Sequence, residues 1–220
     1  HTDPVLAKTY SSRGIKCKAV NKLALQKKYS LPERQDVPML AIISRLASHK
    51  GLDLLCEIAY NLVSDHDVQL VVLGKGESSY ETFFKGMEAQ FPDKVRALIE
   101  YDRDLSRQIY AASDIFVMPS KSEPCGLSQM VALRYGTVPI VRETGGLRDS
   151  ITDSGDGEGN GFTFKTYNAH DMLGAIRRGV DAYWNKEGWD ILVDRAMNCD
   201  FSWGKSANEY IKMYKQVLKD

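Results

Sequence analysis

The sequence contains few cysteines and no long apolar run. Its four cysteines are far apart and form no Cys-x-x-Cys pair, which favours reduced thiols in a cytoplasmic protein. The longest apolar stretches, residues 39–43 and 68–73, are far shorter than the ~20 residues that cross a bilayer, so we expect no membrane partner. The 29 basic and 29 acidic side chains balance, so the overall charge gives no reason to expect a nucleic-acid partner either.

The chain also lacks the features of an exported protein. It begins with His1 rather than Met, and no signal-peptide pattern or Asn-x-Ser/Thr sequon follows. We therefore expect it to start within a longer protein. With 43% hydrophobic and 26% charged residues over 220 positions, the chain can form an ordinary buried core.

Short apolar runs alternate with longer amphipathic stretches, which is the pattern of a βα repeat. Because the expected strands are almost continuously apolar, both faces of their sheet should be covered and the strands should run parallel. The sequence predicts a single α/β domain over residues 1–220, with a doubly wound, mostly parallel Rossmann-like sheet and ligands at the carboxyl ends of its strands. Strands are expected at residues 39–44, 68–73, 95–100, 115–118, 138–141 and 162–164. Helices are expected at residues 16–29, 52–64, 80–90, 105–112, 127–135, 169–184 and 202–218.

Several common binding motifs are missing. A dinucleotide fingerprint fails because Ser79 occupies its third glycine position, and no Walker motif, G-x-S-x-G or H-E-x-x-H occurs. The loop over residues 153–161 is similar to a calcium loop, but Gly157 replaces a ligand and Phe164 stands where the closing Glu should be. We therefore expect neither a metal nor a cofactor.

The first of three polar clusters follows the first expected strand. It covers residues 44–51 and places Arg45 and Lys50 beside the start of a helix. Two fixed cations next to free backbone N–H groups suit a diphosphate. Alternatively, both side chains are solvated loop residues.

The second cluster, residues 119–129, follows the fourth expected strand. Pro124 stiffens the turn that carries Glu123, and Gly126 allows a ligand to approach backbone N–H groups. A carboxylate beside such donors can accept hydrogen bonds from sugar hydroxyls. Alternatively, Glu123 only caps the helix. Cys125 is expected to be a packed thiol rather than a nucleophile, because no His is near it in the sequence.

Three weaker signals lie at other strand ends. Residues 142–149 contain a Gly-Gly pair that leaves room for a ligand, although a turn in which Thr144 caps the next helix explains it better. Gly74 and Gly76 follow the second expected strand and are similarly ambiguous. Tyr101 ends the third strand, where its ring could stack on a nucleobase or could simply pack.

Taken in this order, the clusters resemble the bacterial glycogen synthase and plant starch synthase family of retaining glycosyltransferases. The resemblance covers nearly the whole chain, and it is similar only to the C-terminal, donor-binding half of a two-domain glycosyltransferase B architecture. The segments that carry it are residues 2–4, 18–26, 44–52, 73–76, 119–127, 135–137, 144–147 and 200–203.

The resemblance implies roles for particular residues. Arg45 and Lys50 would bind the donor diphosphate and stabilise its charge as it leaves, Glu123 would contact the glucosyl hydroxyls, and Tyr101 would stack on the nucleobase. Many related enzymes carry a second Glu eight positions after the first, where this chain has Val131. The remaining implied nucleotide-sugar contacts are Gly74, Gly76, Cys125, Gly126, Leu127 and Ser128.

The resemblance further implies transfer of glucose from ADP-glucose to the non-reducing end of an α-1,4-glucan with retention. The acceptor would bind through a missing N-terminal domain, against which a terminal helix over residues 202–218 would pack, so this chain alone should be inactive. A UDP-sugar-dependent transferase and a nucleotide-binding module without turnover are the alternatives. The residues leave bacterial and plastid origins equally open.

Overall fold

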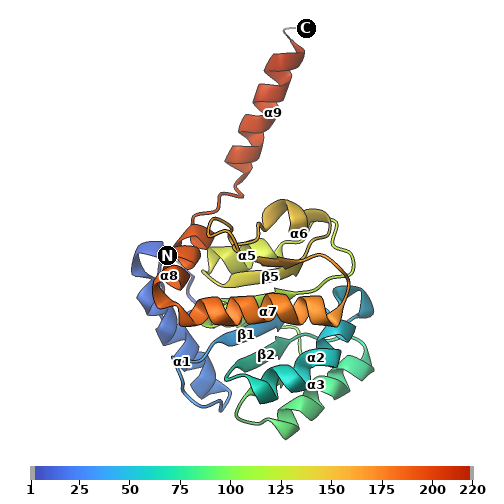
Figure 1. Cartoon of the computed structure of the whole chain (residues 1–220). Helices are drawn as coiled ribbons and strands as arrows, with labels where there is room; N and C mark the ends of the chain where they lie inside the picture. The colour runs from blue at the N-terminus through green and yellow to red at the C-terminus, as the bar shows by residue number, and fades with distance from the viewer. Residues whose placement is uncertain (1–2, 219–220) are drawn as a thin grey trace.

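Six parallel strands form the centre of the fold, in the order β3-β2-β1-β4-β5-β6 (Figure 1). This computed structural model describes residues 3–218. The strands are β1 Met39–Ile43, β2 Gln69–Leu73, β3 Val95–Leu98, β4 Ile115–Met118, β5 Val138–Arg142 and β6 Phe162–Phe164. The helices are α1 Lys18–Lys28, α2 Leu52–Asp65, α3 Ser78–Gln90, α4 Arg103–Ala112, α5 Ser128–Arg134, α6 Gly145–Ser150, α7 Ala169–Trp184, α8 Lys186–Met197 and α9 Trp203–Val217, with short 3-10 helices η1 Ser12–Cys17 and η2 Ser48–Lys50.

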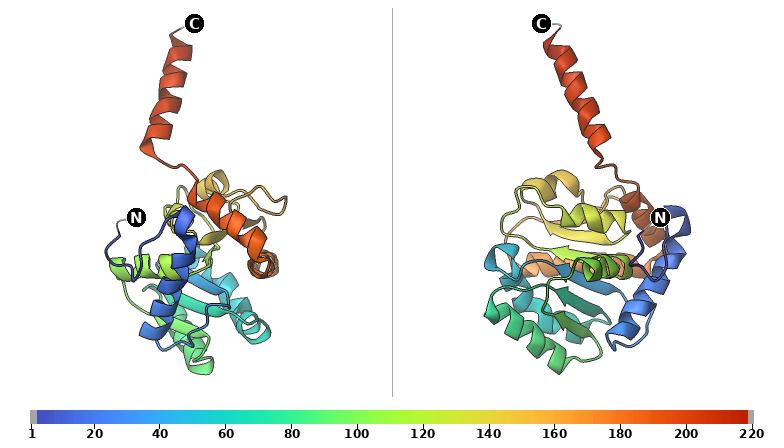
Figure 2. Two further views of the ribbon diagram at one scale, coloured as in Figure 1. Left: turned by 90° about the vertical axis from the view of Figure 1, so that its left-hand side faces the viewer. Right: turned by 180° about the vertical axis from the view of Figure 1, so that it is seen from behind.

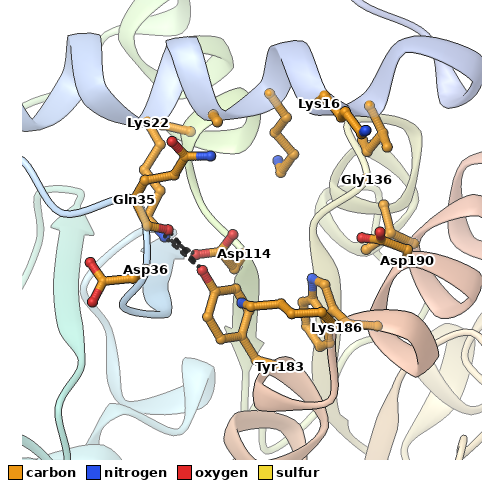
Figure 3. A pocket seen from close by; sticks show the side chains of 15 residues that line it. Lys16, Lys22, Gln35, Asp36, Asp114, Gly136, Tyr183, Lys186 and Asp190 are labelled. Carbon is orange, nitrogen blue, oxygen red and sulfur yellow. Dashed lines mark hydrogen bonds and ion pairs between the residues drawn. The ribbon is translucent and has the colours of Figure 1, made fainter.

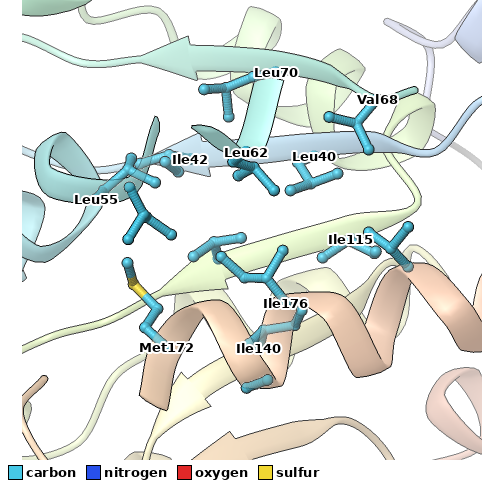
Figure 4. Packing of buried hydrophobic residues seen from close by; sticks show 14 of the residues in the cluster. Leu40, Ile42, Leu55, Leu62, Val68, Leu70, Ile115, Ile140, Met172 and Ile176 are labelled. Carbon is cyan, nitrogen blue, oxygen red and sulfur yellow. The ribbon is translucent and has the colours of Figure 1, made fainter. Parts of the chain in front are cut away.

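Alternation along the strands divides the core between the two faces of the sheet. In β1, Leu40 and Ile42 pack in one apolar cluster with α2, α3 and α7, whereas Met39 and Ala41 pack in another with α1, α4 and α5. Figure 4 shows the first cluster, where Ile176 of α7 lies close to strand side chains. Both faces are therefore covered by helices, and the predicted doubly wound α/β fold is confirmed.

Two parts of the structure differ from the sequence-based expectation. β3 ends at Leu98 because the backbone turns there, with Glu100 N–H donating to Leu98 O at 3.0 Å, so Tyr101 lies in a loop before α4 rather than at a strand end. Helix α8 was not predicted, although its buried side chains recur at helical spacing. These are Trp189, Leu192, Val193, Ala196 and Met197.

Helix α9 projects away from the rest of the chain (Figures 1 and 2). It confirms the predicted C-terminal helix, but none of its residues is buried, and Trp203 at its start is 90% exposed. Its exposed apolar side chains are Trp203, Tyr210, Ile211, Met213, Tyr214 and Val217. Every helix within residues 3–218 is too short or too polar to cross a bilayer.

The strand order determines where a ligand can bind. β1 pairs with β2 on one side and with β4 on the other, so the chain crosses the sheet between β3 and β4. In such sheets the loops after the two strands at the crossover diverge and leave a crevice at their carboxyl ends. The first two polar clusters of the sequence follow β1 and β4, so the topology places them on either side of that crevice.

Candidate functional site

The loops after β1 and β4 are joined by backbone contacts. Lys121 N–H donates to His49 O at 2.9 Å. Gly51 has a left-handed φ of 72°, and a Cβ at this position would lie 2.0 Å from Pro119 O. Because only glycine allows this approach, the two loops are held together as one unit.

An ion pair connects the functional side chains of these two loops. Lys50 Nζ lies 2.7 Å from Glu123 Oε2, and the two side chains are only 21% and 13% exposed. Ser120 Oγ donates to the same carboxylate oxygen at 3.1 Å. The sequence predicted a phosphate contact for Lys50 and a sugar contact for Glu123, and the structure places their charged atoms side by side.

Arg45 lies between two cavities at this edge of the sheet. One, of about 180 Å³, is lined by Arg45, Lys50, Ser120 and Ser128 among others. The other, of about 420 Å³, is lined by Arg45, Ser128 and Tyr101. Arg45 is exposed, and among residues 3–218 its guanidinium has no ion-pair partner. The site therefore offers one uncommitted cation and one cation that already faces a carboxylate.

Tyr101 and Gly74 line the larger cavity, whereas Gly76 does not. Tyr101 is 92% exposed, so its ring packs little against the protein. A Cβ at Gly74 would lie 1.9 Å from Ser44 O, and one at Gly76 would lie 2.1 Å from Leu46 O. Close packing of the β2–α3 loop on the β1–α2 loop therefore accounts for both glycines without a ligand.

Hydrogen bonds from the Gln129 side chain stabilise the turn that follows Glu123. This fully buried side chain donates to Cys125 O at 3.3 Å and to Gly126 O at 3.0 Å. Gly126 is left-handed with a φ of 73°, and a Cβ there would lie 2.6 Å from Gln129 Oε1. Cys125 is exposed, so the expectation of a packed thiol is wrong. Leu127 is also exposed, and Ser128 begins α5. The conformation of this turn therefore depends on Gln129, and of residues 123–128 only Ser128 lines the two cavities.

The Gly-Gly pair after β5 does not leave room for a ligand. A Cβ at Gly145 would lie 2.2 Å from Glu123 O, and one at Gly146 would lie 1.9 Å from Cys125 O. Gly146 N–H also donates to Glu123 O at 3.1 Å. The space that a ligand would need is filled by the backbone of the Glu123 turn, and the Gly-Gly pair supports that turn.

Two residues that contact this site, Arg142 and Tyr167, were not predicted from the sequence. Arg142 donates from Nε to Ser120 O at 3.0 Å and from Nη2 to Lys121 O. Tyr167 lies beneath the Arg142 guanidinium, with 5.5 Å between the guanidinium carbon and the ring centroid. Arg142 begins the segment over residues 142–149 that contains the Gly-Gly pair, so it could have been considered, whereas nothing in the sequence distinguishes Tyr167 from other loop aromatics. Within residues 3–218, no group of three His, Cys, Asp or Glu side chains could hold a metal ion.

Comparisons with known proteins agree with this geometry. A family model described as "Glycosyl transferases group 1" matches residues 25–183. The chain belongs to this family. Glycogen synthases of Bacillus subtilis (strain 168) and Geobacillus thermodenitrificans (strain NG80-2) are 47% and 49% identical to it over 99% of its length, which is 46% and 45% of theirs. The catalytic domain of starch synthase IV from Arabidopsis thaliana, solved with ADP and acarbose, matches all of this chain and 46% of that chain, with 39% identity and a TM-score of 0.88.

These similarities confirm the resemblance to glycogen and starch synthases that the motifs predicted. They also confirm the fold, which is that of a glycosyltransferase B half. The chain spans about half the length of the curated relatives it matches.

A further cavity of about 610 Å³ lies at the opposite, amino-terminal edge of the sheet (Figure 3). The ammonium of Lys18 donates to Tyr110 O, Ala111 O and Tyr135 O at 3.0–3.1 Å, and burial lowers the pKa of Lys18 to about 7. Lys22 pairs with Asp114 at 2.7 Å. The ammonium groups of Lys18 and Lys22 are therefore both bound by acceptors of the protein itself. These contacts connect α1 to the sheet and to the segments that lead into its strands.

Proposed function

We propose that this chain is the donor-binding domain of a glucosyltransferase that transfers glucose from ADP-glucose to the non-reducing end of an α-1,4-glucan with retention. The main observation behind the proposal is that Arg45, Lys50 and Glu123 lie close together at the carboxyl ends of β1 and β4, where the strand order of the sheet reverses. The chain is also 47% identical to a glycogen synthase. The starch synthase neighbour was solved with ADP and acarbose, which supports a nucleotide-sugar donor and a glucan acceptor.

Each site residue has a chemical role in this proposal. Arg45 and Lys50 neutralise the diphosphate as the bond to the anomeric carbon breaks, and Glu123 accepts hydrogen bonds from the glucosyl hydroxyls. Tyr101 stacks on the nucleobase. Backbone of the turns after β2 and β4 completes the donor site through Gly74, Gly76, Cys125, Gly126, Leu127 and Ser128.

The proposal includes retention because the resemblance to glycogen and starch synthases implies it. No protein nucleophile is needed if the diphosphate leaves and the acceptor hydroxyl attacks on the same face of the sugar. The leaving phosphate then takes the proton of the acceptor hydroxyl, and Lys50 holds that phosphate in place. The proposed reaction uses no cofactor and no metal, because the two cations supply the positive charge.

The acceptor and the second wall of the cleft come from an N-terminal half outside this chain. We propose that α9 packs against that half, because its apolar side chains, such as Tyr210 and Tyr214, are exposed here. Residues 1–220 then form a single C-terminal domain. We also propose that the protein acts in the cytoplasm, or in a plastid if it comes from a plant.

Calorimetry with ADP and UDP, followed by a glucan-elongation assay, tests the proposal. The chain should bind ADP more tightly than UDP, and Arg45→Ala should weaken ADP binding, whereas Arg177→Ala on α7 should not. The chain alone should not incorporate glucose from ADP-glucose into glycogen, because proximity catalysis needs the other half. Tighter binding of UDP would favour a UDP-sugar transferase, and elongation at the rate of a full-length enzyme would contradict the division of the site between two halves.

A further inference from the structure

We propose that Arg142, Tyr167 and Asp53, here called the brace, are positioning residues that hold the Glu123 loop at a fixed distance from the Lys50 loop. None of these three residues lines either of the two cavities described above. Its three members come from the end of β5, from the β6–α7 connection and from the first turn of α2. The expected effect of the brace on ADP affinity rests on the proposed function. Its effect on the position of the Glu123 loop is independent of that function.

Arg142 fixes the start of the Glu123 loop. One guanidinium donates to the carbonyls of two consecutive residues, Ser120 and Lys121. A planar fork of donors can do this only when the two carbonyls point the same way, so the contact selects one backbone conformation. Ser120 is completely buried and donates to Glu123, so this conformation is passed on to the carboxylate.

Tyr167 connects Arg142 to the helix that follows Lys50. The Arg142 guanidinium and the Lys121 ammonium lie 5.5 Å and 5.4 Å from its ring centroid, within the range of a cation–π contact. Its hydroxyl donates to Asp53 Oδ1 at 2.5 Å. Burial, together with the hydrogen bond to Asp53, raises the pKa of Tyr167 above its ordinary value, so the hydroxyl keeps the proton that it donates.

The brace closes a ring of contacts around the site. From Lys50 the chain passes through Gly51 into α2 and Asp53, and the brace leads from Asp53 through Tyr167 and Arg142 back to the Glu123 loop. The Lys50–Glu123 ion pair completes the ring. A side-chain pair at 2.7 Å requires its two backbones to keep a fixed separation, and the brace contributes to that constraint by connecting the Glu123 loop to α2.

Amide hydrogen exchange at Lys121, with no ligand present, tests the brace directly. Lys121 N–H donates to His49 O across the two loops, so it reports their separation. Arg142→Met removes two hydrogen bonds, and each net bond corresponds to about a two- to tenfold change in an equilibrium, so the exchange rate of Lys121 should rise about four- to a hundredfold. Arg142→Lys should give an intermediate rate, since one ammonium can still reach one carbonyl.

Tyr167→Phe isolates the other end of the brace, because it keeps the ring and removes only the bond to Asp53. Matched controls are Tyr183→Phe, which removes a hydroxyl bonded to Gln35 O at the opposite edge, and Arg178→Lys, which alters a guanidinium that also contacts a carbonyl and an aromatic ring. The controls should leave Lys121 exchange unchanged. Val117 in β4 should exchange at the wild-type rate in all variants, which separates loop positioning from loss of global stability.

ADP calorimetry on the same variants gives the functional consequence. We expect the dissociation constant to rise about two- to tenfold in Tyr167→Phe and Arg142→Met. Unchanged Lys121 exchange in both variants, or exchange that rises equally at Val117, would overturn the brace. Faster Lys121 exchange with wild-type ADP affinity would overturn its positioning role. If the wild-type chain does not bind ADP, the proposed function fails, and Lys121 exchange still decides whether the brace exists.

Discussion

Replacing Glu123 with Ala should strengthen the binding of ADP to this chain. Lys50 Nζ is 2.7 Å from the Glu123 carboxylate, so a diphosphate must either displace that carboxylate or share the ammonium with it. Displacement costs the ion pair, and sharing brings two anions together. Both routes lower the affinity for ADP, and both disappear when the carboxylate is removed.

The magnitude follows from how far the pair is exposed. Fully exposed pairs contribute about 0–1 kcal/mol, and hydrogen bonds to charged groups in less exposed sites contribute about 1.5–3 kcal/mol. With side-chain exposures of 21% and 13%, this pair lies between these classes. We therefore expect a gain of about 1–2 kcal/mol, which is about a five- to thirtyfold lower dissociation constant.

Isothermal titration calorimetry with ADP measures the change, and a double-mutant cycle assigns it. Lys50→Ala should weaken binding about ten- to a hundredfold, and adding Glu123→Ala to that variant should give little further change. Glu143→Ala is a matched control, because this carboxylate accepts from Thr163 Oγ1 and has no ion-pair partner within residues 3–218. An equal gain from Glu123→Ala with and without Lys50 would refute the competition. Loss of ADP binding in a folded Glu123→Ala chain would refute the assignment of Glu123 to the sugar.

Three further changes have separate expected outcomes. Arg45→Ala should raise the dissociation constant for ADP about ten- to a hundredfold, and denaturation by urea should show unchanged stability, because the exposed guanidinium has no ion-pair partner among residues 3–218. Tyr101→Ala should cost about 1–3 kcal/mol of ADP binding in calorimetry, while Tyr101→Phe retains it, since stacking needs only the ring. Burial raises the pKa of Asp153, but hydrogen bonds from Arg178, Thr163 N–H and Gly155 N–H lower it to about 2 from its ordinary 3.8. Because its pKa is lowered on folding, ionised Asp153 stabilises the folded chain above pH ~4, and this contribution is lost as the pH falls towards 2. After discounting for solvent screening, the contribution to the free energy of unfolding is about 1 kcal/mol. Asp153→Asn should remove that part of the pH dependence of urea unfolding.

The fold could be predicted because its signal is local. Each buried parallel strand is a short, nearly continuous apolar run, and each run between turn residues is visible without knowing its neighbours. Helix α8 carries an equally regular apolar pattern, but Asn185 and Gly188 at its start make the segment look like a loop. In the structure Asn185 caps the helix by accepting from Gly188 N–H, so residues typical of turns begin a helix here.

The site could be predicted in its parts but not in its contacts. Arg45, Lys50 and Glu123 were identified because each follows a strand, where a parallel sheet presents its ligands. Their ion pair depends on β1 lying next to β4, a pairing between segments more than seventy residues apart that leaves no trace in either segment. Tyr167 is harder still to identify, because its role consists of contacts with two other elements.

The glycines show why ambiguous turns could not be assigned from sequence. Gly74, Gly76 and Gly146 each stand where a Cβ would lie within about 2 Å of a backbone carbonyl of another loop. A glycine that makes room for a ligand cannot be distinguished, from sequence alone, from a glycine that makes room for another backbone segment. Here the glycines mostly admit another backbone, and the loops after β1, β2 and β4 and the start of α6 pack on one another. The cations and the carboxylate therefore extend from a packed layer of backbone. Such a layer can hold Lys50 and Glu123 in register before any donor arrives, which lowers the cost of ordering the site when it binds.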